Sequence, residues 1–358
     1  MKQGRTLPQV LAELKRQEQV KKDYVAPAQT LCLDDDGSTF QILDKTGSSA
    51  GNIREAFGTT ELFHSQLAAA LGIPSKYYGM MKSKKPELLA ENVNSWLNDK
   101  PQSYMVRSMD YGRGRVARAL LSARYRRIDN LEIASAVLPL FAGNPDIEIM
   151  SQEVTENRLY LKVVNHRIEK ACVGDIVQAG VMISNSEVGL GAVSVKPLIY
   201  TLACTNGMVV DSMGERKTHV GRAVKALEDD LQAYSDETMQ AEDRAFLLKL
   251  RDATMAAIDE ARFGMVVKKL EDSHNAKITG RVQDVVELTG KAYDLNQTEQ
   301  DGILDYLIRG GDLSLYGLGN AITRESQDVE SYDRATALEG IGWRVVTMEP
   351  SMWKEINK

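Results

Sequence analysis

Seven arginines between residues 107 and 129 are the side chains of this sequence best suited to a chemical task. They are Arg107, Arg113, Arg115, Arg118, Arg124, Arg126 and Arg127, and Asp110 and Asp129 are the acids of the same stretch. The whole chain has a net charge of −6, so this segment inverts the charge of the protein around it. Guanidinium groups form forked hydrogen bonds with phosphate oxygens, which makes a polyanion the expected ligand.

Basic residues continue into a strand-like block that follows the arginines. In RLYLKVV, Leu159, Leu161 and Val163 alternate with Arg158, Tyr160 and Lys162, which predicts one apolar and one polar, basic face. The run AVSVKPLIYTLAC adds Lys196 and Tyr200 to the polar side. The candidate nucleic-acid contacts are Arg107, Arg113, Arg115, Arg118, Arg124, Tyr125, Arg126, Arg127, Arg158, Tyr160, Lys162, Lys196, Tyr200, Arg216, Lys217, Arg222 and Lys225.

Each of these candidates has a plainer interpretation. The arginines could form a solvated face that pairs with acidic helices of the C-terminal half. Tyr125, Tyr160 and Tyr200 could stack on bases, as in single-strand binders, or simply pack in half-buried strands. Seven arginines against two local acids favour a ligand, whereas the tyrosines favour ordinary packing.

The sequence gives little support for metal binding, covalent catalysis or nucleotide binding. The histidines are scattered, no HExxH occurs, and Cys32, Cys172 and Cys204 lie far apart, so neither a metal nor a disulfide framework is expected. Cys204 could form a nucleophile and base pair with His166 or His219, but a buried position at a strand end explains Cys204 better. The GxG pieces lack a third glycine and no Walker sequence exists, so neither an ATPase nor any cofactor is predicted.

The composition predicts a soluble protein. A hydrophobic content of 43% and a charged content of 26% suit a globular chain, and no run of eighteen apolar residues or apolar signal core is found. Three scattered cysteines fit a reducing compartment. We therefore expect a cytoplasmic protein with no membrane contact.

The elements that must position these residues suggest three consecutive regions. Residues 1–100 predict an amphipathic helix, a hairpin with its turn at Asp36 and Gly37, and a helical scaffold from 59 to 97. Residues 101–225 form the basic β-rich core, in which 115–127 fits either a strand after a glycine turn or a helix. Residues 226–358 read as a mostly helical, acidic region, and the fold class is α+β with a central antiparallel meander packed by helices.

A heptad pattern begins at the end of the basic core. Apolar residues recur at alternating spacings of four and three at Val220, Val224, Leu227, Leu231 and Tyr234, and the pattern continues less regularly to about Phe263. Residues 228–260 carry ten acids. This stretch predicts a solvated or partner-facing helix that could join subunits.

Three motifs in order carry a resemblance to a known family. They are SMDYGRGRVARALLSARYRRIDN, ISNSEVGLGAVSVKPLIYTLACTNGMV and YGLGNAITRE. Over residues 100–345 the chain resembles the phage and plasmid-like family known as domain of unknown function nine-three-two. That family brings no activity or site residue, but it implies a mobile-element origin. The architecture is also similar to that of Rad52-like single-strand annealing proteins.

These observations lead to one functional prediction and one alternative. The first is a phage- or plasmid-derived, ATP-independent protein that binds single-stranded DNA, or RNA, and anneals strands as a homo-oligomeric ring or filament. The alternative is a non-enzymatic interaction factor whose acidic helices bind a host or virion protein while its arginines form internal ion pairs.

Overall fold

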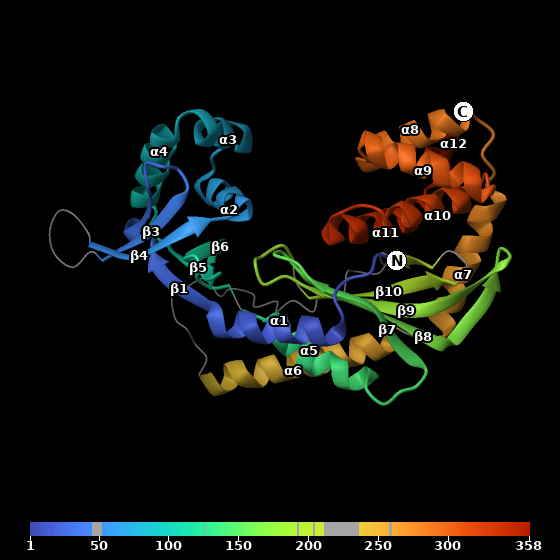
Figure 1. The fold of residues 1–358 in the computed structure, drawn as a ribbon, viewed down its shortest axis with the longest axis horizontal. Coiled ribbons are helices and arrows are strands. Elements are labelled where there is room, and N and C mark those ends of the chain that lie inside the picture. The colour runs from blue at the N-terminus through green and yellow to red at the C-terminus, as the bar shows by residue number, and fades with distance from the viewer. Residues whose placement is uncertain (45–51, 126, 192, 203–204, 211–235, 258–259) are drawn as a thin grey trace. The chain divides into compact units, whose positions relative to one another are not determined.

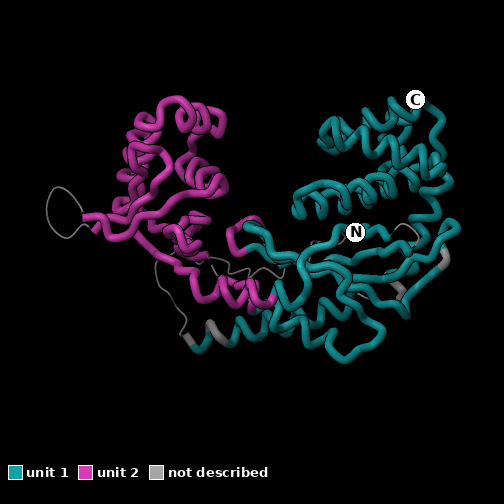
Figure 2. The backbone as a smooth tube through the Cα atoms, viewed as in Figure 1, with its two compact units in different colours: residues 1–10, 132–186, 191–358 teal, residues 11–131, 187–190 magenta. Residues whose placement is uncertain are grey.

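The fold is that of a computed structural model, which describes residues 1–44, 52–125, 127–191, 193–202, 205–210, 236–257 and 260–358 (Figure 1). The chain divides into two compact units, and neither is one continuous stretch of sequence (Figure 2). Unit 1 holds residues 1–10, 132–186 and 191–358, and unit 2 holds residues 11–131 and 187–190. These units cut across the three consecutive regions expected from the sequence.

Unit 2 is built on a six-stranded sheet with the strand order β1-β5-β6-β4-β3-β2. Its strands are β1 (Lys21–Pro27), β2 (Leu31–Leu33), β3 (Thr39–Asp44), β4 (Asn52–Thr59), β5 (Ser103–Asp110) and β6 (Arg115–Ser122). Neighbouring strands are antiparallel except β4 and β6, which pair in parallel. The hairpin predicted at Asp36 and Gly37 is confirmed, with Gly37 at a φ of 66° in the turn between β2 and β3.

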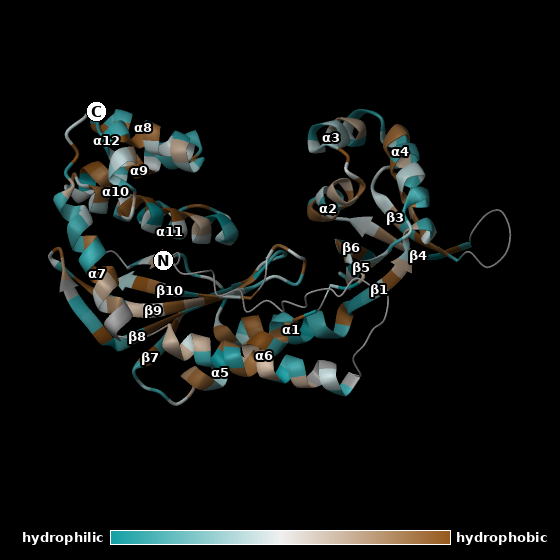
Figure 3. Ribbon diagram, turned by 180° about the vertical axis from the view of Figure 1, so that it is seen from behind, coloured by the Kyte–Doolittle hydropathy of each residue, from teal (hydrophilic) through white to brown (hydrophobic). Residues whose placement is uncertain are grey.

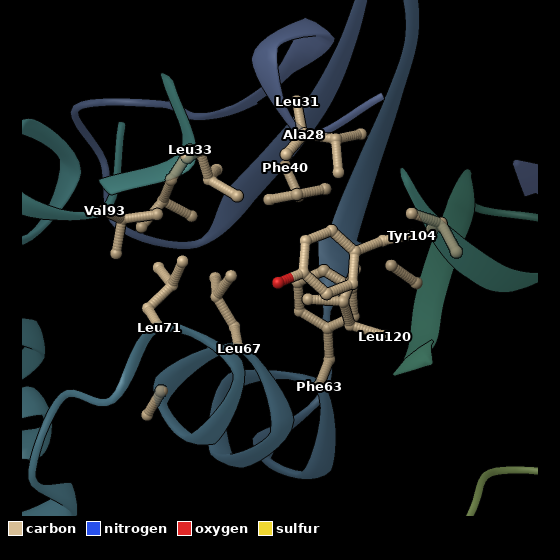
Figure 4. Packing of buried hydrophobic residues seen from close by; sticks show 14 of the residues in the cluster. Ala28, Leu31, Leu33, Phe40, Phe63, Leu67, Leu71, Val93, Tyr104 and Leu120 are labelled. Atoms are coloured by element: carbon tan, nitrogen blue, oxygen red, sulfur yellow. The ribbon is translucent and has the colours of Figure 1, made fainter. Parts of the chain in front are cut away.

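Three helices cover this sheet and confirm the helical pattern predicted from residue 59. They are α2 (Glu61–Leu71), α3 (Ser75–Lys84) and α4 (Pro86–Asp99). Thr60 caps α2 by accepting a hydrogen bond from the Phe63 amide, and Gly72 ends the helix in the left-handed conformation. The core between helices and sheet includes Phe40, Phe63 and Leu120, all buried (Figure 4).

The first helix and a short turn complete this part of the chain. The amphipathic helix expected over residues 1–25 is confirmed for α1 (Leu7–Val20), whose Val10 and Leu14 are buried, whereas Lys21–Pro27 forms β1 instead. A short 3-10 helix (Ala28–Thr30) joins β1 to β2.

Unit 1 is built on a five-stranded antiparallel meander with the order β11-β10-β9-β8-β7. Its strands are β7 (Ile147–Val154), β8 (Leu159–Cys172), β9 (Asp175–Asn185), β10 (Ser194–Thr201) and β11 (Asn206–Val209). Hydrophobic residues run along these strands (Figure 3). The meander and the helices confirm the α+β class.

Helices cover the meander on both sides (Figure 1). They are α5 (Asn130–Phe141), α6 (Asp236–Ala256), α7 (Glu260–Asn275), α8 (Val282–Tyr293), α9 (Gln297–Gly310), α10 (Leu315–Glu325), α11 (Tyr332–Val346) and α12 (Pro350–Ile356). Both α10 and α11 contact β11, while α6 contacts β10 and α7 contacts β8 and β9. The motif YGLGNAITRE therefore lies on a buried packing helix, where nine of its eleven helical positions are buried.

Candidate nucleic-acid interface

The segment that carries the arginines folds as a β-hairpin and not as a helix. Strands β5 and β6 pair from Tyr104–Ser122 to Asp110–Arg115, and Gly112 and Gly114 take positive φ values in the turn. Arg113 lies in this turn, whereas Arg124 follows the far end of β6. An eight-residue strand separates the two, so the seven arginines do not form one continuous row.

Unit 2 gathers part of the predicted cluster into a largely buried group of charges, here called the arginine network, in which Arg127 alone is exposed. Its members are Lys21, Asp23, Arg107, Arg118, Arg127, Asp129 and Glu187. They come from β1, β5, β6, the segment that follows β6, and the short stretch 187–190. The network thus joins strands to two irregular segments of the same unit.

Arg107 is the centre of the network, with only 4% of its side chain exposed. Its Nε donates to Asp23 Oδ1 at 3.0 Å, one terminal nitrogen donates to Asp129 Oδ1 at 2.8 Å, and the other donates to the Glu187 carbonyl oxygen at 2.9 Å. Burial opposes the charge of the guanidinium, but Asp129 and Asp23 outweigh it and raise the pKa of Arg107. Burial likewise opposes the charge of Asp129, but Arg107 and Lys21 lower its pKa.

Glu187 extends the network to the segments on either side. Its Oε1 accepts the Asn130 amide at 2.7 Å, and its Oε2 lies 3.5 Å from a terminal nitrogen of Arg118. Lys21 pairs with both Asp129 and Glu18. The four basic groups of the network therefore meet its three carboxylates and Glu18, so the charges are close to balanced.

The structure corrects the prediction for two of the arginines. Arg107 and Arg118 are buried and bound to carboxylates, so they do not present their guanidinium groups to a ligand at the surface. Asp129 lies within the arginine stretch, but Asp23 and Glu187 are distant in sequence. Asp23 is 84 residues from Arg107. Counting only the acids within residues 107–129 missed these two.

Three candidates at the end of β6 remain accessible. Arg124 is exposed, Tyr125 is half-buried, and 56% of the Arg127 side chain is exposed. Arg127 places a terminal nitrogen 3.1 Å from Asp23 Oδ2, on a carboxylate that Arg107 already holds. Arg124, Tyr125 and Arg127 are here called the basic strip, and the ion pair of Arg127 with Asp23 joins the strip to the network.

The two arginines near the hairpin turn differ from the strip. Arg113 is exposed in the turn itself. Arg115 is half-buried and donates to the Val20 carbonyl oxygen and to Ser108 Oγ, both at 3.2 Å. Arg115 is therefore engaged with its own sheet.

The predicted polar face of the meander in unit 1 is buried, which is a second correction. Tyr160, Lys162 and Tyr200 are 5%, 0% and 7% exposed. The Lys162 ammonium lies 2.7 Å from Glu339 Oε2 of α11 and donates to Thr336 Oγ1 at 3.0 Å. The strand alternation was predicted correctly, but α11 covers the face that was expected to meet a ligand.

Burial also sets the electrostatics of this second cluster. It lowers the pKa of Lys162, although Glu339 acts in the opposite direction. The ring of Tyr332 lies 4.6 Å from the same ammonium and 5.4 Å from the ring of Tyr160. This group locks α11 to the sheet, and on the same sheet Arg158 and Lys196 stay half-buried.

Several predicted features lie outside the residues that the structure describes. They are Arg126, Arg216, Lys217, Arg222, Lys225, Cys204 and the seam from Val220 to Tyr234. They stay predictions.

Sequence reasoning also missed residues that organise the site. Asp23, Glu187 and Glu339 each hold a predicted contact residue in a buried pair. The only sequence signal for these acids was their position inside an otherwise apolar strand-like or helical pattern. Such acids are too common for the sequence to predict their partners.

Other site chemistry is limited in the described part of the chain. No three His, Cys, Asp or Glu side chains gather there in a way that could hold a metal ion. Burial raises the pKa of Cys172 to about 11, so its thiol is protonated and unreactive at neutral pH. Residues 1–44, 52–125 and the later described ranges include no helix long and apolar enough to cross a membrane.

Comparison of the chain with protein-family models, with curated proteins and with solved structures finds no match. The resemblance drawn from the three sequence motifs stays a prediction.

Proposed function

We propose that the chain is a phage- or plasmid-derived, ATP-independent protein that binds single-stranded nucleic acid in the cytoplasm and anneals complementary strands. The contact surface in this proposal is smaller than the sequence suggested. It is centred on the basic strip, with Arg124 and Arg127 as phosphate contacts and Tyr125 beside them.

The arrangement around Asp23 is the observation that supports this proposal most. Arg127 is more than half exposed and shares that carboxylate with the buried Arg107. Arg127 can therefore turn to a phosphate without leaving a buried carboxylate unpaired, which would otherwise be costly. The network keeps the strip in place while the exposed guanidinium exchanges one oxygen ligand for another.

Backbone contacts of this kind suit annealing. Arginines that hold phosphates read no sequence and leave the base edges free to pair with a second strand. One strip would bind weakly, so an annealing protein needs several copies on one strand to raise the total affinity. Homo-oligomerisation is accordingly part of the proposal.

Binding of a labelled single-stranded oligonucleotide at several salt concentrations tests the proposal. Arg124→Ala combined with Arg127→Ala should weaken binding and lower the slope of log affinity against log salt by about 1.4, since each lost phosphate contact removes about 0.7 on single strands. The slope separates lost phosphate contacts from a general loss of folded protein.

A matched control removes two arginines from unit 1. Arg167 and Arg309 have side chains 76% and 74% exposed, so Arg167→Ala with Arg309→Ala makes the same change of charge. This control should bind as the unchanged protein does. If no oligonucleotide binds at low salt, or if both double variants bind equally, the proposal is wrong.

A protein-interaction factor is the second candidate, and the buried ion pairs of Arg107 and Arg118 favour it. In this view the arginines serve only the fold, and exposed acids of α6 such as Glu237 and Glu242 meet a basic protein. The same salt series decides between the two, because this candidate predicts no oligonucleotide binding at low salt.

A further inference from the structure

The outward side of α6 carries a row of small and apolar side chains that the fold leaves exposed. This row, here called the outer stripe, consists of Ala241, Ala245, Leu248, Asp252 and Met255. Leu248 and Met255 are 48% and 49% exposed. Hydrophobic and hydrophilic residues both occur along this helix (Figure 3). Two large apolar side chains at a spacing of seven on an exposed helix are a feature of interaction surfaces.

The inner side of the same helix is already occupied. Phe246, Leu250 and Thr254 are buried, and α6 contacts β10 of its own unit. Residues two apart on a helix point in nearly opposite directions, so Leu248 faces away from Leu250. The outer stripe is therefore a second apolar surface, separate from the one that attaches α6 to its unit.

The outer stripe continues the heptad pattern of the preceding sequence without a change of phase. From Val220 the spacing of four and three runs through Tyr234 and Thr238 and reaches Ala241, and it then follows the stripe to Met255. Nine of these eleven positions are apolar, with Thr238 and Asp252 as the exceptions. Within α6 the pattern runs from Thr238 to Met255, about two and a half heptads, and such a repeat is typical of a helix that packs against another helix in a coiled coil.

We propose that the outer stripe is a self-association surface, on which α6 of a second copy of the chain packs in antiparallel orientation. Residues beside the seam favour this orientation. In a parallel pair, Glu237 would face Glu242 and Arg244 would face Lys249, so like charges would meet. In an antiparallel pair, Glu242 of each copy faces Lys249 of the other. Arg244 then faces Arg251, so fewer like charges meet than in a parallel pair.

The same orientation gives each seam residue a suitable neighbour. Leu248 packs against the small Ala245 of the second copy, and Met255 packs against its Thr238. Asp252 faces Ala241, one helical turn from Arg244 of the second copy, which supplies a positive partner. A charged residue in the seam fixes the register of such a pair.

This inference gives a contact surface to the oligomer of the proposed function. Its test needs no nucleic acid, so the two proposals can fail separately. Sedimentation of the full chain over a roughly hundredfold range of concentration measures the association. The unchanged protein should associate reversibly, and Leu248→Glu combined with Met255→Glu should raise the dissociation constant at least about tenfold.

A methionine on the next helix provides the matched control. Met265 of α7 is 52% exposed and lies outside the stripe, so Met265→Glu should leave the association unchanged. The inference is overturned if the unchanged protein stays monomeric at every concentration. Equal association of the double variant and the unchanged protein would overturn it as well.

A charge-pairing experiment tests the orientation. Copies with Ala245→Lys and copies with Leu248→Glu should each associate weakly alone and regain association when mixed, because antiparallel packing brings positions 245 and 248 together. Recovery only in a mixture of Leu248→Lys with Leu248→Glu would show parallel packing and contradict the antiparallel surface.

Discussion

Arg107 and Arg127 share the carboxylate of Asp23, yet they play different parts. Arg107 is buried, and all three of its nitrogens donate to protein oxygens. Arg127 lies at the surface, and one of its terminal nitrogens donates to Asp23. A guanidinium that is fully bound inside a protein supports its fold and not its binding of a ligand. Residue type alone cannot distinguish these roles, because the distinction depends on burial.

The first prediction concerns the stability of the arginine network. Arg107→Met leaves Asp23 and Asp129 buried without their main partner and should destabilise the protein by about 3 to 5 kcal/mol. The midpoint of urea unfolding at neutral pH measures the change. Arg167→Met removes an exposed pair with Asp146 and should cost no more than about 1 kcal/mol. Equal midpoints for the two variants would show that the network carries no particular stability.

A buried histidine gives unit 2 a sensitivity to acid. Thr59 Oγ1 donates to the Ser38 carbonyl oxygen at 2.7 Å, so it accepts from His64 Nε2 at 2.8 Å. In the neutral ring the other nitrogen, Nδ1, accepts the Tyr78 hydroxyl at 2.8 Å, and protonation of His64 would prevent this. Burial, together with Lys82, lowers the pKa of His64 to about 4.

The second prediction follows from that lowered pKa. The unfolded chain takes up the proton near pH 6.5 and the folded chain only near 4, so stability is complete above pH 6.5 and falls as the pH drops to about 4. The loss should be on the order of 3 kcal/mol, measured by urea unfolding across that range. The free energy of unfolding should fall with pH in the unchanged protein, and this part of the fall should be absent in His64→Gln.

Glycines at the crossing of α10 and α11 show what determines packing at the scale of an element. A Cβ added at Gly319 would lie 2.4 Å from Val346 Cγ2, and one added at Gly342 would lie 2.4 Å from Thr323 Cγ2. Both would also approach a backbone carbonyl of the facing glycine, at 3.0 and 2.9 Å. The two helices can therefore lie this close only because neither position has a side chain.

The third prediction compares two glycines of the same helix. Gly342→Ala should destabilise the protein by about 1 to 3 kcal/mol, because the added methyl group forces α10 and α11 apart. Gly340→Ala on α11 meets nothing within 4 Å and should be neutral or stabilising by up to about 1 kcal/mol. Thermal unfolding of both variants measures the contrast. A similar loss at both positions would rule out close packing as its cause.

Strand patterns were predictable from the sequence, but the cover of the meander was not. The alternation in β8 follows from local spacing, and it correctly separated Leu161 and Val163 from Tyr160 and Lys162. The burial of Lys162 depends on Thr336, which lies 174 residues later in the chain. A buried lysine looks like an exposed one in sequence when its acid partner belongs to a distant helix. Local patterns therefore predicted the elements and could not predict their contacts.

At the scale of the whole molecule, acid partners that are distant in sequence bury some of the predicted nucleic-acid contacts, so the interface is smaller than predicted. The overall charge is −6 and the stretch is rich in arginine, but two of the acids that balance Arg107 and Arg118 come from β1 and from residues 187–190, outside that stretch. In the described part of the arginine stretch, the exposed guanidinium groups lie in small areas, namely Arg113 in the turn and the basic strip. A protein with such small areas needs more than one copy to hold a polyanion firmly.

The fourth prediction joins the basic strip to the outer stripe. An oligonucleotide long enough to reach the strips of two associated copies should bind on the order of a hundredfold more tightly than one that fills a single strip, because the second contact is intramolecular. Leu248→Glu with Met255→Glu should abolish this gain and leave the affinity for the short oligonucleotide unchanged. Arg124→Ala with Arg127→Ala should weaken binding of both lengths. Titration of labelled oligonucleotides of increasing length into each variant measures these effects. If the affinity of the unchanged protein does not depend on oligonucleotide length, the association of copies contributes nothing to nucleic-acid binding.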